Sequence, residues 1–138
     1  MASGTRKDDI AGVSAHDAAE SFRDTRIKAF YIMGSGPGQG FIAESLKSIR
    51  VPFIVDTAQF DDVLEPRANS SASTRQIPGA REVIRAAGHF VYAPECIGPI
   101  PATVSHICSD PAGVDRALVH KRVAHDAIEF FTSNLSRK

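Results

Sequence analysis

The feature that most constrains the fold is the run of residues 51–55, Val-Pro-Phe-Ile-Val, which is apolar at every position. A strand with one exposed face alternates apolar and polar residues, whereas a strand buried on both faces of a parallel sheet is apolar throughout. Proline is tolerated at the second position because it lies near the start of the strand. The run therefore predicts an interior strand of a parallel sheet.

The segments around this run predict a repeating order of strand and helix. Residues 26–33 and 81–86 favour two further strands, since they are rich in branched and aromatic side chains. Residues 41–49 have apolar side chains at helical spacing, and the polar segment 68–77 predicts a second helix that ends before Pro78. Crossovers of this length make consecutive strands parallel.

A long amphipathic helix is expected after Gly113, where apolar residues recur at roughly helical spacing. Asp115 falls in its first turn, while Arg137 and Lys138 lie beyond its end, where their charges suit the helix dipole. The predicted fold class is α/β, with a parallel sheet of about three strands, flanking helices and this C-terminal helix packed on the sheet.

The chain divides into two unequal parts. Residues 1–24 are polar and weakly patterned, with a possible helix over 15–22, and residues 25–138 form one α/β domain. With 138 residues, of which 43% are hydrophobic, the chain is long enough to bury a sizeable core as one domain.

Charge and hydropathy exclude several classes of partner. Sixteen basic residues balance sixteen acidic ones, so the chain lacks the electrostatic footprint for nucleic acid or an anionic membrane. Its apolar runs are far shorter than the about 20 residues of a membrane-spanning helix. The N-terminus has no apolar stretch of the kind that a secretory signal needs. We therefore expect a cytoplasmic protein, as written, with small partners and neither nucleic acid nor membrane.

Cys96 and Cys108 lie twelve positions apart, and this spacing suits either a small loop disulfide or two unrelated free thiols. A disulfide is expected if the chain belongs to a longer precursor that is exported to the periplasm or secreted. The pair lacks Cys-x-x-Cys spacing and has no histidine at metal-ligand intervals near both, which argues against zinc. Neither a metal nor a cofactor is expected.

Two residues suggest chemistry because each occupies a loop just after a predicted strand. Asp61 lies in Gln-Phe-Asp-Asp-Val-Leu-Glu-Pro after the second strand, and His89 lies in Gly-His-Phe after the third. A carboxylate followed by an imidazole in this order is how the last two members of an α/β-hydrolase triad are carried. Asp62 and Asp56 compete with Asp61 as the acid.

Residues 24–135 resemble the C-terminal half of α/β-hydrolases, and within them the predicted dienelactone hydrolase group. The matching motifs are Arg26-Ile27-Lys28-Ala29, Gly40-Phe41, Glu44-Ser45-Leu46, Val51-Pro52, Asp61-x-Val63-Leu64-x-Pro66, Ile77-Pro78-Gly79-Ala80, Gly88-His89-Phe90 and Ile107-Cys108-x-Asp110-Pro111-x-Gly113-Val114-Asp115-Arg116.

This resemblance makes Asp61 the triad acid, because it precedes the Val-Leu-x-Pro pattern, and His89 the general base. It implies a partial α/β-hydrolase-like sheet over residues 25–138, without the family's N-terminal half, and hydrolysis of a small carboxylic ester or lactone. The imidazole takes the proton of an attacking serine, and the carboxylate fixes the imidazole tautomer.

The chain departs from that family at the nucleophile. The family places its serine in Gly-x-Ser-x-Gly, a turn between strand and helix. The nearest sequence here is Gly12-Val13-Ser14-Ala15-His16, which ends in histidine and follows no predicted strand. The upstream loop that donates an oxyanion amide is also missing. Ala58 and Glu65 stand where the family usually has glycine and proline.

Two alternatives remain open. The chain is a non-catalytic hydrolase remnant, or a subunit that forms homo-oligomers or is completed by another chain, because a partial sheet exposes a strand edge and apolar faces. Otherwise, the loop with Gly34, Gly36, Gly38 and Gly40 binds a phosphate or small ligand. Its spacing fits neither Gly-x-Gly-x-x-Gly nor a P-loop.

Overall fold

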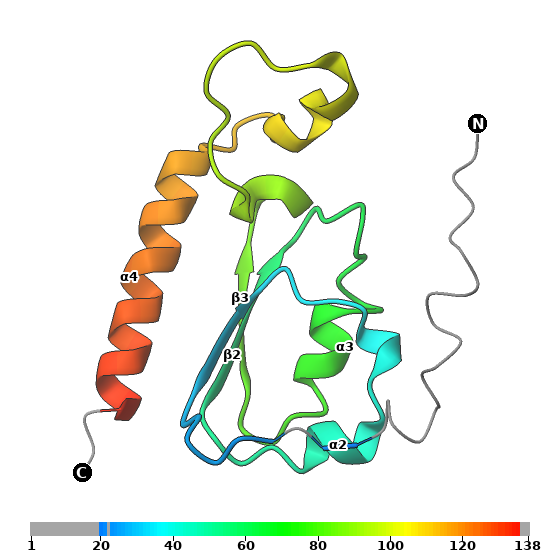
Figure 1. Ribbon diagram of the computed structural model, residues 1–138, viewed down its shortest axis with the longest axis vertical. Helices are drawn as coiled ribbons and strands as arrows, with labels where there is room; N and C mark the ends of the chain where they lie inside the picture. Colours follow the sequence, from blue (N-terminus) through cyan, green and yellow to red (C-terminus); the bar gives the residue numbers. More distant parts are fainter. Residues whose placement is uncertain (1–19, 22, 136–138) are drawn as a thin grey trace.

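The computed structural model describes residues 20–21 and 23–135. Within this part of the chain, strands β1 (Phe30–Met33), β2 (Phe53–Ala58) and β3 (Arg81–Arg85) form a parallel sheet in the order β1-β2-β3. Helices α2 (Ala43–Lys47) and α3 (Ser70–Thr74) cover one face, and α4 (Arg116–Leu135) lies along the other (Figure 1). The predicted α/β arrangement of strands and long C-terminal helix is confirmed at this level.

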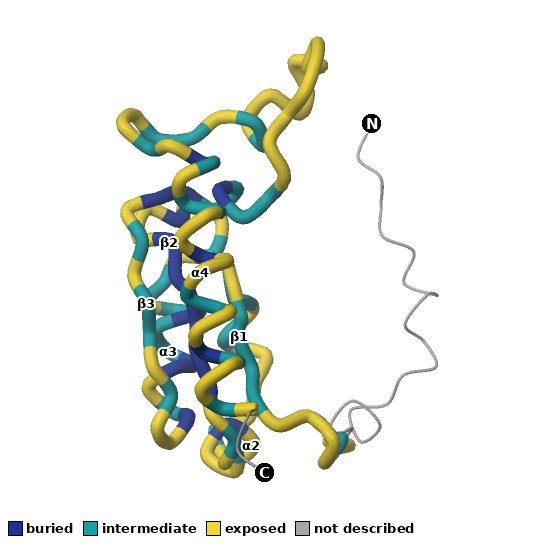
Figure 2. Tube along the Cα trace, turned by 90° about the vertical axis from the view of Figure 1, so that its left-hand side faces the viewer, coloured by how far each residue is buried: buried dark blue, intermediate teal, exposed yellow. Residues whose placement is uncertain are grey.

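Strand β2 is the centre of the sheet, and all six of its residues are buried. Figure 2 shows it as a dark blue segment between the neighbouring strands and behind α4. Its register aligns Phe53 with Phe30 of β1 and Asp56 with Val83 of β3. The burial explains why its first three residues, Phe53 to Val55, are apolar, as expected for parallel sheets.

The two faces of the sheet differ in chemistry. On the α2 and α3 side, a hydrophobic cluster joins β2 to both helix segments, and it consists of Leu46, Phe53, Val55 and Ile77, with Phe30, Ile32, Ile49 and Ala80 packed against it. On the α4 side, the Tyr31 ring meets Phe130 edge-on at 6.1 Å between centroids. Polar side chains share that second face with the aromatic contact.

Several predicted element ends are wrong. The first strand begins at Phe30 rather than residue 26, because the Asp24 carboxylate accepts the Arg26 backbone N–H at 2.8 Å and holds a turn. The second strand runs three residues past the predicted end, to Ala58, because its pairing with β3 continues that far. Helices α2 and α3 are both shorter than predicted.

Helix α4 begins one residue after Asp115, which was expected inside the first turn. The Asp115 carboxylate instead accepts the Leu118 N–H at 3.0 Å and caps the helix. The segment before it, residues 93–115, extends beyond the end of the sheet and contains the 3-10 helix η4 (Ala102–Cys108) (Figure 1). None of the described helices has the length and apolar character needed to cross a membrane.

Candidate functional site

Asp61 lies in the loop that follows β2, and backbone hydrogen bonds hold this loop. Gln59 donates its N–H group to the carbonyl of Arg85, the last residue of β3, at 2.7 Å, and Phe60 donates to the carbonyl of Ala87 at 2.9 Å. The Asp61 carboxylate then folds back on its own loop. Its Oδ1 accepts the N–H groups of the residues two and three positions later, at 3.0 and 2.6 Å. One carboxylate oxygen is thus fixed by backbone, which leaves Oδ2 for another partner.

His89 supplies that partner from the end of the neighbouring strand. It is the first residue of the 3-10 helix η3 (His89–Tyr92), which follows β3. Its Nδ1 lies 2.8 Å from Asp61 Oδ2. The Asp61 side chain is 5% exposed and the His89 side chain 21% exposed. The structure therefore brings the two predicted residues together, with the acid buried and the imidazole partly open to solvent.

This contact determines which ring nitrogen carries the proton. An ionised carboxylate only accepts hydrogen bonds, so Nδ1 of His89 donates, and in the neutral imidazole Nε2 then has the lone pair. Among residues 20–21 and 23–135, the Asp61 contact is the hydrogen bond that the His89 ring makes. A lone pair on Nε2 is what a general base requires. Ser14, the serine in the nearest match to the family's Gly-x-Ser-x-Gly motif, lies outside the described residues.

The competing acids do not reach His89. Asp62 is exposed in the same loop. Asp56 lies inside β2 and its carboxylate is bonded to the Arg85 guanidinium and to two tyrosines. Of the three aspartates considered from the sequence, Asp61 is the one whose carboxylate faces the imidazole.

Residues 93–115 border the histidine. The Phe90 ring stands edge-on between two imidazoles, with centroids 4.8 Å from His89 and 5.5 Å from His106 of η4. Gly88, just before the histidine, lies so close to Pro111 that an added Cβ would meet the proline ring at 3.2 Å. The segment therefore packs against Gly88 and Phe90, the residues on either side of His89.

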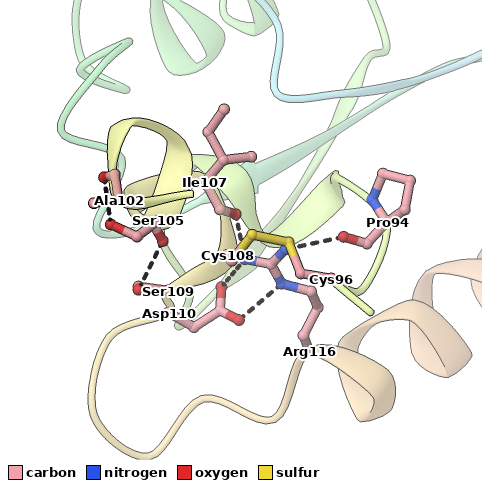
Figure 3. Close-up of a disulfide and its surroundings, with 9 residues drawn as sticks. All are labelled: Pro94, Cys96, Ala102, Ser105, Ile107, Cys108, Ser109, Asp110 and Arg116. Atoms are coloured by element: carbon pink, nitrogen blue, oxygen red, sulfur yellow. Dashed lines mark hydrogen bonds and ion pairs between the residues drawn. A yellow bond between two sulfur atoms is a disulfide. The ribbon is translucent and has the colours of Figure 1, made fainter. Parts of the chain in front are cut away.

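A disulfide and an arginine fix the conformation of residues 93–115 (Figure 3). Cys96 and Cys108 are bonded, with their Cα atoms 5.7 Å apart, so the alternative of two free thiols does not describe the structure. Arg116, the first residue of α4, binds the Asp110 carboxylate through Nε at 2.8 Å and Nη2 at 3.0 Å. It also donates to the carbonyls of Pro94 and Ile107. One buried guanidinium thus ties both ends of the segment to the long helix.

Sequence reasoning missed a polar cluster buried under α4. Asp56, with 0% of its side chain exposed, accepts hydrogen bonds from Tyr31 at 2.6 Å and Tyr92 at 2.8 Å. Arg85 binds the same carboxylate and also reaches Asp126 of α4 at 2.6 Å. A signal was present, because Asp56 directly follows an apolar strand run in which a charge needs a partner.

The cluster keeps its hydroxyl groups protonated. Burial, followed by the hydrogen bond to Asp56, raises the pKa of Tyr31 to about 12. Burial and the Asp56 charge raise the pKa of Tyr92 as well. Conversely, the hydrogen bond from Arg85 lowers the pKa of Asp126. Both tyrosines are therefore hydrogen-bond donors to Asp56 over the ordinary pH range.

An apolar cavity of about 530 Å³ lies on the other face of the sheet, beside β1. Its lining includes Phe30, Ile32, Phe53 and Val55, while Asp61 and His89 do not line it. The volume falls in the range of small-molecule sites. Because neither the acid nor the base lines the cavity, it does not define a substrate site for them.

The glycine-rich loop is engaged in packing. The peptide bond between Gly36 and Pro37 is cis. The Gly38 N–H is donated to the Asn69 side chain at 2.9 Å, and an added Cβ on Gly38 would lie 2.8 Å from the Asn69 backbone. The Gly38 N–H is thus unavailable to a phosphate. The backbone of Asn69 approaches Gly38 so closely that a side chain there would not fit, which explains the glycine. Phosphate binding by this loop stays a prediction.

One group of possible metal ligands occurs in the described part of the chain, namely His125, Asp126 and Glu129 of α4, of which His125 and Glu129 are exposed and Asp126 is partly buried. Asp126 is already paired with Arg85, and the His125 side chain is 76% exposed. These contacts describe a solvated helix face with an ion pair.

Comparison of the chain with protein-family models, with curated proteins and with solved structures found no match.

Proposed function

We propose that this chain carries the acid and base of a serine hydrolase of the α/β-hydrolase type, acting on a small carboxylic ester or lactone. Asp61 is the acid that orients the ring, and His89 is the general base. The observation that carries the proposal is the 2.8 Å contact between His89 Nδ1 and Asp61 Oδ2. The opposite ring nitrogen is then able to accept a proton.

The fixed geometry of the carboxylate supports these roles. Two backbone N–H groups hold Oδ1 of Asp61, so Oδ2 has a defined direction toward the imidazole. In the reaction, His89 Nε2 takes the proton of a serine hydroxyl as its oxygen attacks the carbonyl carbon, and Asp61 stabilises the resulting imidazolium. The imidazolium then gives this proton to the departing alkoxide oxygen, which leaves an acyl-enzyme ester that water hydrolyses.

No serine of the described residues is hydrogen-bonded to His89, so the proposal takes its nucleophile from Ser14 or from another chain. Intact-mass detection of fluorophosphonate labelling distinguishes these sources. If Ser14 serves, the purified chain gains one adduct, His89→Ala abolishes it, and Ser14→Ala abolishes it too. His125→Ala removes an exposed histidine remote from Asp61 and is the matched control, which should label as the unchanged chain does.

If the folded chain forms no adduct, the chain alone does not contain a complete hydrolase site. An adduct that survives His89→Ala would contradict the assigned base. An adduct on a serine other than Ser14, mapped by peptide mass, would keep the base and replace the nucleophile.

A second candidate function, a subunit completed by a second copy of this chain, rests on β1. Within the described residues, β1 pairs with β2 along one side and has no strand on the other. The apolar cavity lies beside this free edge. An open strand edge next to apolar surface favours pairing with another strand.

Sedimentation of the purified chain tests this candidate. The unchanged chain is expected to form dimers or larger species, and Met33→Lys on the free edge of β1 is expected to shift it to a monomer. Ile84→Lys on the opposite edge strand is the control, since Ile84 is also exposed but lies in β3. A monomeric unchanged chain, or equal effects of both variants, would contradict pairing through β1.

A further inference from the structure

The 3-10 helix η3 carries His89 at its first position and Tyr92 at its last. Residues three apart in a 3-10 helix lie on the same side. Both side chains accordingly reach the segment that contains β2. His89 meets Asp61 in the loop after the strand, and Tyr92 donates its hydroxyl hydrogen to Asp56 inside the strand at 2.8 Å.

Asp56 is a fixed anchor for that hydroxyl. Its side chain is fully buried, and its other bonds tie it to β1 through Tyr31 and to β3 through Arg85. The strand that contains Asp56 is hydrogen-bonded on both sides. A side chain that binds this carboxylate is therefore held relative to the whole sheet.

Two further contacts hold the Tyr92 ring and the η3 backbone. Gly34 directly follows β1 with φ +56°, and a Cβ added there would lie 3.3 Å from the tyrosine ring. On the side of α4, Nε2 of His120 lies 2.7 Å from the carbonyl oxygen of Val91. Burial and the Asp56 charge raise the pKa of Tyr92, which keeps its hydroxyl protonated.

We propose that Tyr92 is a positioning residue for His89: its hydroxyl, bonded to the buried Asp56 carboxylate, fixes the η3 turn where His89 Nδ1 meets Asp61. A role of Tyr92 in catalysis rests on the function proposed above. Its role in holding His89 against Asp61 does not, because that contact exists without substrate.

The tautomer of His89 shows directly whether Tyr92 holds the imidazole against Asp61. NMR shifts of the two ring nitrogens distinguish Nδ1–H from Nε2–H in the full chain. The unchanged protein is expected to hold the Nδ1–H form. In Tyr92→Phe, the ratio of Nδ1–H to Nε2–H is expected to fall by a factor of about 5 or more, as for loss of one hydrogen bond.

Tyr31→Phe is the matched control. It removes the same hydroxyl group from the same Asp56 carboxylate, yet Tyr31 lies in β1 and not in η3. Its His89 tautomer ratio is expected to stay within twofold of that of the unchanged protein, a small change on the scale of RT. No change in Tyr92→Phe, or an equal change in both variants, overturns the proposal.

A second pair of variants covers the case in which Tyr92→Phe does not fold. Gly34→Ala places a methyl group against the Tyr92 ring, whereas Gly79→Ala introduces a similar backbone strain at φ +74° with nothing within 4 Å. A tautomer shift in the first variant alone supports the proposal, and any other pattern overturns it.

The two proposals fail in distinguishable ways. If fluorophosphonate never labels the chain but Tyr92→Phe shifts the tautomer, the hydrolase function fails and the positioning of His89 stands. If the chain is an active hydrolase, Tyr92→Phe is expected to lower kcat with little change in KM, because the Tyr92 hydroxyl is bonded to the buried Asp56 carboxylate. An unshifted tautomer in an active enzyme overturns the positioning alone.

Discussion

Arg85 holds Asp56 through two of its nitrogens: Nε lies 2.9 Å from both carboxylate oxygens, and Nη2 lies 2.6 Å from Oδ2. The two residues come from adjacent strands, and the carboxylate is fully buried. Removing one partner of a buried ion pair leaves a charge without compensation, which costs far more than the pair contributes as a whole. The stability of the sheet should therefore depend on Arg85.

We expect Arg85→Met to lower the free energy of unfolding by about 3 to 5 kcal/mol, because the Asp56 charge then stays buried without its cation. Urea unfolding measures this change. Arg122→Met, an exposed arginine of α4, is the control and should stay within about 0.5 kcal/mol of the unchanged chain. Equal losses in the two variants would show that the Arg85 contact does not stabilise the sheet.

Asp61→Asn should reverse the tautomer of His89. The amide keeps one oxygen for the loop N–H groups, and its NH2 group then faces the imidazole and requires an acceptor at Nδ1. The proton moves to Nε2, as the ring-nitrogen NMR shifts would report. Hydrolase activity, where present, is expected to fall by about 10⁴-fold.

Asp62→Asn is the control for that prediction, since Asp62 is the exposed neighbour of Asp61 in the same loop. It should leave both the tautomer and the activity unchanged. An Nδ1–H tautomer that persists in Asp61→Asn would contradict the hydrogen bond assigned to the carboxylate.

The disulfide between Cys96 and Cys108 predicts a specific thiol count. Thiol titration of the unfolded chain should find no free thiol without reductant and two after reduction, because the sequence contains two cysteines. Loss of a cross-link that closes a loop of this size is expected to lower the free energy of unfolding by about 3 kcal/mol.

Urea unfolding with and without reductant measures this effect. The double variant Cys96→Ala and Cys108→Ala is the control, because it should match the reduced chain and not respond to reductant. Two reactive thiols before reduction would contradict the cross-link.

The tyrosines of the buried cluster predict alkaline instability. The pKa of Tyr31 is about 12 in the folded chain, above the value near 10 of an unfolded tyrosine. The folded state therefore binds the proton more tightly. This contribution to stability is complete below pH 10 and is lost as the pH rises from about 10 through 12.

Ultraviolet titration of tyrosinate tests this, because the chain has two tyrosines and both belong to the cluster. Tyr92→Phe leaves Tyr31 as the single titrating group. Its midpoint should lie well above that of the urea-unfolded chain. Ionisation at the same pH in both states would contradict the contact with Asp56.

The candidate site was partly predictable from local sequence. Asp61 and His89 each follow a strand signal, and parallel strands bring their carboxyl ends to one edge of the sheet. The sequence did not show that the carboxylate would turn toward the histidine rather than cap its own loop. In the structure, Oδ1 of Asp61 caps the loop and Oδ2 contacts His89.

The buried cluster around Asp56 and Arg85 could not be predicted from the local sequence pattern. Asp56 and Arg85 are separated by 29 positions, and Arg85 and Asp126 by 41. Their contacts depend on the pairing of β2 with β3 and on where α4 crosses the sheet. A polar residue next to an apolar run signals that a partner is needed, but it does not identify that partner.

The sequence by itself determined the α/β order of elements, the burial of β2 and the long C-terminal helix, because periodicity and apolar runs reflect the environment of each residue along one element. Only the tertiary structure decided the ends of the strands, the contact of His89 with Asp61 and not with Asp56 or Asp62, and the attachment of η3 through Tyr92. Those depend on strand register and on the paths of the loops, which bring together residues far apart in the chain.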